Sequence, residues 1–89
     1  MRDFNAILRS FSKTRKHLNT WPDVDADMIQ AADQTIIRIY QTHRDFQNKC
    51  FTLDTNSLIE IDDQLFRIDS ITYDAKRPKY TNCSVTKIA

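Results

Sequence analysis

Two histidines and two cysteines, His17, His43, Cys50 and Cys83, are the residues of this sequence whose chemistry best suits metal binding. Imidazole nitrogen and thiolate sulfur are ligands that zinc prefers, but the spacing here contains neither a C-x₂₋₄-C pair nor an H-x₃₋₅-H pair. His43 also falls on an apolar stripe with helical spacing, which is typical of a histidine at the edge of a core. We therefore expect no metal site and no cysteine–histidine nucleophile.

A second candidate for chemistry is acidic. Asp62 and Asp63 precede Asp74-Ala75-Lys76 in an order similar to that of metal-dependent nucleases, in which carboxylates hold a metal ion and a lysine assists hydrolysis. Asp74 and Lys76 fall at the tip of a predicted loop, which is a poor place to hold catalytic groups precisely. The chain also contains no glycine, which excludes the glycine-dependent phosphate loops and nucleophile elbow. We expect no enzyme, no cofactor and no small-molecule ligand.

Basic residues gather in two places where they could neutralise phosphates, although 13 Lys and Arg against 12 Asp and Glu give the whole chain a net charge of only +1. Tyrosines beside the second group could stack on bases. Against this, residues 50–75 hold six acidic residues and one basic residue, and no known nucleic-acid-binding motif is present. Nucleic-acid binding is therefore the alternative hypothesis. Its candidate residues are Arg9, Lys13, Arg15, Lys16, Lys76, Arg77, Lys79 and Tyr80.

The first half of the chain has the apolar spacing of helices. One run should end near Asn19, because Trp21-Pro22 follows and the residue before a proline avoids the helical region. A second run extends from Pro22 to about Asn48 and includes Ile36 on its apolar stripe. With so short a link, the two helices should form an antiparallel hairpin. The apolar residues of the first run are Phe4, Ile7, Leu8, Phe11 and Leu18.

From Phe51 onward, β-branched and aromatic residues alternate with clusters of turn residues, which is typical of strands. Asp62-Asp63 is expected to form a tight turn without glycine, and a β-bulge near Asp69-Ser70 would bring the apolar residues of the middle strand onto one face. The predicted strands are Leu58–Ile61, Leu65–Tyr73 and Thr81–Ile88, with Phe51–Leu53 as a possible fourth.

These elements predict the fold class α+β in one domain, residues 1–89. An N-terminal antiparallel helical hairpin (1–49) is expected to pack on a C-terminal antiparallel β-meander of three to four strands (50–89). A chain of this size buries only about 60–65% of its unfolded surface and is marginal alone.

Several apolar side chains fall outside the predicted core and need cover. An apolar second face on a small sheet indicates a partner, and a tryptophan in a loop either anchors an interface or closes the end of a core. We therefore expect a non-enzymatic protein-interaction or assembly module, an oligomer or a subunit of a larger complex, which binds itself or another protein. The candidate partner-binding residues are Trp21, Ile37, Leu58 and Leu65. Ile88, like Ile37, Leu58 and Leu65, is expected to point away from the core.

The compartment is expected to be intracellular. The sequence has no apolar run of the roughly 18–20 residues that span a bilayer, and Met1 to Asn5 do not begin a signal peptide. In general character, the short, glycine-free and charge-patched chain is similar to small accessory and connector proteins of viruses and phages, a likeness that covers no motif. We expect a cytoplasmic protein, or one within a virion if a virus encodes it, with no membrane partner.

Overall fold

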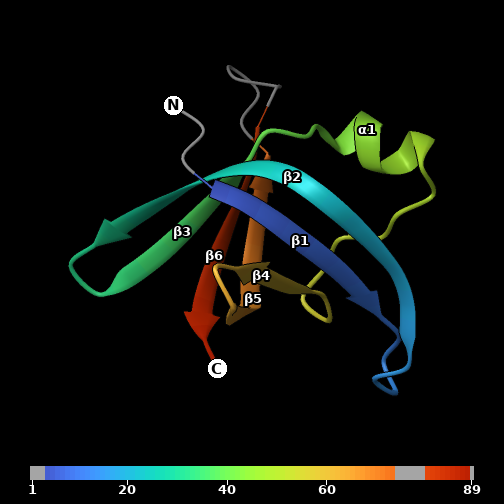
Figure 1. The fold of residues 1–89 in the computed structure, drawn as a ribbon, viewed down its shortest axis with the longest axis horizontal. Helices are drawn as coiled ribbons and strands as arrows, with labels where there is room; N and C mark the ends of the chain where they lie inside the picture. The colour runs from blue at the N-terminus through green and yellow to red at the C-terminus, as the bar shows by residue number, and fades with distance from the viewer. Residues whose placement is uncertain (1–3, 74–79, 89) are drawn as a thin grey trace.

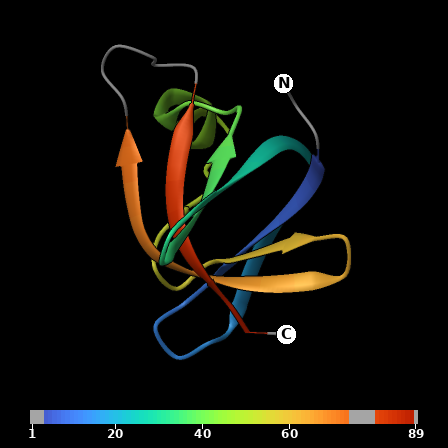
Figure 2. The same ribbon diagram turned by 90° about the vertical axis from the view of Figure 1, so that its left-hand side faces the viewer.

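The computed structural model describes residues 4–73 and 80–88. Its six strands form one closed antiparallel barrel with the order β1-β2-β3-β6-β5-β4, in which β4 pairs back onto β1 (Figure 1; Figure 2). One short helix lies between β3 and β4. The elements are β1 (Phe4–Phe11), β2 (His17–Ala31), β3 (Gln34–Ile39), α1 (His43–Asn48), β4 (Leu58–Ile61), β5 (Gln64–Tyr73) and β6 (Thr81–Lys87).

The predicted α+β fold is therefore wrong. Most of residues 1–49 form strands in place of a helical hairpin, and the second predicted helix is reduced to α1 at its C-terminal end. Strands from the two predicted halves also pair with each other, β1 with β4 and β3 with β6. The predicted boundary near residue 49 therefore divides one continuous sheet.

The apolar spacing of β1 explains the error. Ala6, Leu8 and Ser10 are buried along one face of the strand, although one is small and one is polar. Ile7 and Phe11 lie on the other face, where they are half-buried. Large apolar residues on both faces obscure the two-residue period of a strand and fit the helical period as well.

Trp21-Pro22 marks a bulge inside a strand and not the end of a helix. The β1–β2 register passes from Ala6↔Val24 to Leu8↔Trp21, so β2 carries an additional residue there. Proline is tolerated at such a bulge because it has no N–H to donate to the ladder. Asp23 takes the left-handed conformation (φ 57°), which aspartate adopts more readily than most residues.

The three main strands predicted for the second half are confirmed to within a residue, whereas the possible fourth, Phe51–Leu53, does not form a strand. Asp62 and Asp63 form the two-residue turn between β4 and β5, with φ of 51° and 63°, as expected of a hairpin turn of the primed kind. The bulge in β5 is confirmed too, because the β5–β6 register shifts between Ile68 and Ser70. These strands form part of the barrel wall and not a separate sheet with helices on one face.

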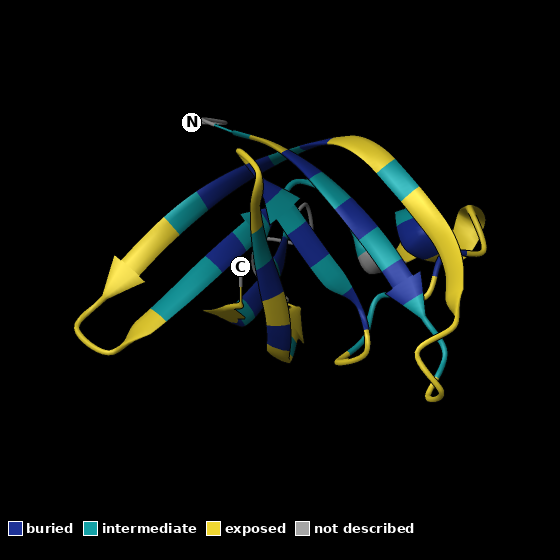
Figure 3. Cartoon of the chain, turned by 60° about the horizontal axis from the view of Figure 1, so that its bottom comes forward, coloured by how far each residue is buried: buried dark blue, intermediate teal, exposed yellow. Residues whose placement is uncertain are grey.

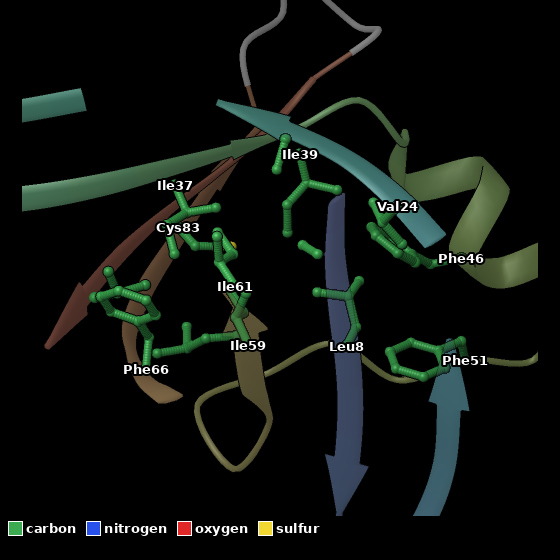
Figure 4. Close-up of a cluster of buried hydrophobic side chains, with 14 residues drawn as sticks. Leu8, Val24, Ile37, Ile39, Phe46, Phe51, Ile59, Ile61, Phe66 and Cys83 are labelled. Carbon is green, nitrogen blue, oxygen red and sulfur yellow. The ribbon is translucent and has the colours of Figure 1, made fainter. Parts of the chain in front are cut away.

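The core fills the barrel interior, as the alternation of buried and exposed positions along the strands shows (Figure 3; Figure 4). All six strands contribute to it, and so do Phe46 of α1 and Phe51 after the helix. Among the described residues, no helix has the length and apolar character needed to cross a membrane. The largest fully buried apolar side chains are Leu8, Val24, Ile37, Ile39, Ile59, Ile61 and Ile68.

Candidate partner-binding site

An open pocket of about 270 Å³ lies where β1 ends and β4 begins. Ligand pockets for drug-sized molecules usually have about 300–1,000 Å³, so this hollow suits one or two protruding side chains better than a small-molecule cofactor. We call it the arginine pocket. It is lined by Phe11, Arg15, Thr55, Asn56, Leu58, Arg67 and Ile88.

Three side chains from distant parts of the sequence form the apolar surface of the arginine pocket. Phe11 is the last residue of β1, and its ring meets His17 edge-on at 5.5 Å. Leu58 is the first residue of β4, where it pairs with both neighbouring strands. The Ile88 amide donates to the Leu65 carbonyl at 2.8 Å, which holds this side chain beside β5 although it is 49% exposed.

Two guanidinium groups flank these apolar residues. Arg15 is exposed in the β1–β2 loop, with φ of 64°, and its amide donates to the Ser12 carbonyl at 2.9 Å. Arg67, on β5, contacts Asp69 at 3.1 Å while more than half of its side chain stays exposed. Among residues 4–73 and 80–88, no acidic residue lines the arginine pocket. An apolar hollow with cationic walls is suited to an apolar group that has an anionic neighbour.

Asp69 orients Arg67 from outside the pocket. Its carboxylate accepts a hydrogen bond from the Thr86 hydroxyl at 2.6 Å as well as the contact from Arg67. The Thr86 hydrogen bond, assisted by Arg67, lowers the pKa of Asp69 below its ordinary value. The aspartate therefore stays ionised at neutral pH and continues to hold Arg67 beside the pocket.

The predicted basic residues of the first segment do not form one surface. Lys13, Arg15 and Lys16 are exposed together in the loop between β1 and β2. Arg9, in contrast, donates to Glu60 of β4 at 2.8 Å, and both side chains are about 30% exposed. The pair ties β1 to β4, so Arg9 has a structural partner. Lys76, Arg77 and Lys79 lie outside the described residues.

Tyr80 lies at the opposite end of the barrel from the β1–β2 loop, which carries Lys13, Arg15 and Lys16. It directly precedes Thr81, which pairs with Ile39, whereas the basic loop follows the opposite end of β1. Its ring meets Tyr40 edge-on at 4.6 Å, and Arg38 lies 5.6 Å over its face. The Tyr40 hydroxyl donates to Asp27, and that hydrogen bond raises the pKa of Tyr40. Tyr80 is thus part of a packed cluster.

The structure does not bring all four predicted partner-binding residues together. Leu58 lines the arginine pocket, and Leu65 is half-buried on β5 next to it. Trp21 packs against Phe46 and closes the edge of the core. The placement of Ile37 outside the core is wrong, because the side chain is fully buried in the barrel. The closed barrel turns inward a residue that a helical period turns outward.

Phe11 and Arg67 line the pocket but were not predicted site residues. Phe11 fits the helical stripe of the first run and looks like a core residue there. Arg67 stands alone between Phe66 and Ile68, with no basic neighbour to mark it. Only the pairing of β4 with both β1 and β5 brings the two together. No local sequence signal reports that closure.

The two cysteines differ sharply in accessibility. Cys50 is exposed and Cys83 is fully buried, and burial raises the pKa of the Cys83 thiol to about 12 from about 9. The thiolate is the reactive form, so alkylation of the folded protein at mildly alkaline pH should modify Cys50 alone. Mass spectrometry should find a second modified thiol only after denaturation. Double modification of folded protein would contradict the burial.

The raised pKa of Cys83 also determines the direction in which this thiol makes stability change with pH. The unfolded chain releases the Cys83 proton above pH 9, while the folded protein keeps it until about pH 12. Because the unfolded state then binds fewer protons, this thiol should make stability fall with rising pH inside that window and not below it.

The described residues contain no group of three or more His, Cys, Asp or Glu able to hold a metal ion.

Comparisons of this chain with protein-family models, curated proteins and solved structures find no match.

Proposed function

We propose that this chain is a non-enzymatic protein-interaction module that works in an assembly and binds its partner protein at the arginine pocket. The observation that carries the proposal is the pocket itself, in which Phe11, Leu58 and Ile88 present apolar surface between Arg15 and Arg67. Burying such a surface against a partner supplies the free energy of binding. The two arginines add orientation and selectivity for an anionic neighbour.

The arrangement supports a protein partner better than the nucleic-acid alternative. A polyanion gains affinity from many cations on one face, but Tyr80 and the basic β1–β2 loop occupy opposite ends of the barrel. Arg9 is engaged by Glu60. The apolar half of the arginine pocket would also gain little from a phosphate backbone.

The test is a selection of short peptides on the immobilised protein, followed by NMR titration of the enriched sequences. We expect enriched peptides that combine one large apolar residue with acidic residues. Their amide shifts should map to Phe11, Leu58 and Ile88. Ile88→Asp should weaken binding by roughly tenfold or more, because it places a charge in the apolar hollow.

Leu18→Asp is the matched control, because Leu18 is 51% exposed and does not line the arginine pocket. It should leave peptide binding unchanged. Equal losses in both variants, or shifts that map elsewhere, would refute the pocket as the binding site. Binding of duplex DNA that weakens steeply with salt and moves only the Lys13–Lys16 amides would favour the nucleic-acid alternative.

A further inference from the structure

The β2–β3 hairpin carries a second exposed apolar feature. Its turn extends away from the body of the barrel (Figure 1; Figure 3). Ile29 is 37% exposed and lies directly across the ladder from the half-buried Ile36, while Ala31 and Ala32 are exposed at the turn. We call residues 29–36 the hairpin tip. Neither Ile29 nor Ile36 belongs to the hydrophobic core of the barrel.

The charge of the hairpin tip is opposite to that of the arginine pocket. Asp33 is the only charged residue in positions 29–36, and it is exposed at the turn. Two other large exposed apolar side chains, Leu18 and Ile88, are less suited to fill the pocket. Leu18 follows the basic loop, whose cations would meet Arg15, and Ile88 lines the pocket already. Ile29 combines exposed apolar surface with a nearby anion.

We infer that the arginine pocket of one molecule receives the hairpin tip of a second copy of this chain. Ile29 would enter the apolar hollow formed by Leu58 and Ile88, and Asp33 would meet Arg15 or Arg67. The inference rests on the proposed function, since it names the occupant of the same pocket.

The contact must join different molecules. The hairpin tip follows the end of β2, whereas the β1–β2 loop that supplies Arg15 precedes its start, 15 residues away. No residue of the hairpin tip lines the arginine pocket of its own chain, so the contact that we infer joins two molecules. Because the two surfaces differ, the interface is heterologous, and successive copies would add head to tail into a ring or a filament.

The experiment is light scattering on a size-exclusion column over a range of protein concentrations. We expect the mass of the wild-type protein to rise above the 10.5 kDa of one chain as concentration increases. Ile29→Asp and Ile88→Asp should each weaken association on the order of a hundredfold, so each variant should elute as a monomer. Leu18→Asp should associate like the wild type.

Mixing the two variants gives the decisive result. Ile29→Asp keeps an intact arginine pocket, and Ile88→Asp keeps an intact hairpin tip, so the mixture should form a one-to-one dimer that cannot grow further. Misfolded variants would not recover association on mixing. Asp33→Arg should weaken association by roughly fivefold and reduce its salt dependence.

The outcomes separate this inference from the proposed function. A wild-type protein that stays monomeric, yet binds acidic apolar peptides in the pocket, would overturn self-docking and leave the interaction module standing. A monomer that binds no peptide would overturn both. Association that survives both single variants, or that requires added nucleic acid, would also refute the hairpin tip as the occupant.

Discussion

Replacing Phe46 with alanine is expected to lower the free energy of unfolding by about 3–5 kcal/mol, the usual cost of deleting a buried aromatic ring. Phe46 is 2% exposed although it lies on the short helix α1. Its ring meets Trp21 edge-on at 5.2 Å and lies 5.9 Å from Phe51. A small domain has only about 5–15 kcal/mol of stability in total, so the variant should be largely destabilised.

Trp21 reports the same event, because it is the only tryptophan of the chain. Loss of the neighbouring ring should admit water and shift its fluorescence to longer wavelength before global unfolding begins. Phe46→Leu is the matched control, since it retains apolar volume and should lose less stability. Urea unfolding measures both variants. A loss below about 1 kcal/mol with unchanged emission would show that α1 does not seal the barrel through this ring.

The short helix α1 has a local sequence signal for its start, although the fold predicted around it is wrong. Thr42 caps its start: the Thr42 hydroxyl accepts from the Asp45 amide at 3.0 Å, and the Asp45 carboxylate accepts from the Thr42 amide at 2.9 Å. Such a capping box fixes a helix start from four residues of sequence. The helix ends at Asn48, where the predicted long helix was also expected to end.

The strands of the second half could be predicted because their signals are local. The buried Ile59 and Ile61 lie on either side of Glu60, and Asp62-Asp63 supplies the turn. The bulge at Asp69 followed from the change of parity along β5. Each signal spans fewer than a dozen residues. Pattern and turn chemistry therefore agreed, as they do in sequences that specify one local structure.

The first half could not be predicted because tertiary closure decides it. β1 is held by β4, and the Arg9–Glu60 ion pair of that ladder joins residues 51 positions apart. Small Ala6 and polar Ser10 point into a narrow barrel, where they fit beside larger side chains from other strands. A search for large apolar residues does not identify small or polar residues, such as Ala6 and Ser10, as buried. The arginine pocket depends on the same closure. Of its lining, only Arg15 and Leu58 were candidate site residues, and Ile88 was expected only to need cover.

Ile36 and Ile37 give the sharpest test of barrel against helical hairpin. The helical spacing places Ile36 in the core and Ile37 outside it, whereas the structure buries Ile37 completely and leaves Ile36 partly exposed. Ile37 pairs with Met28 on one side and with Cys83 on the other. Ile37→Ala should therefore cost about 2–5 kcal/mol, because deleting its methyl groups leaves a cavity in a packed interior.

Ile36→Ala is the matched control, with the same chemical change one position away. It should cost clearly less, since solvent can fill the space beside Ser84, its partner across the ladder. Thermal and urea unfolding of the two variants, compared with the wild type, measure the difference. The reverse order, with Ile36→Ala the more damaging, would return β3 to a helix whose apolar stripe contains Ile36. It would also remove the strand that carries half of the hairpin tip.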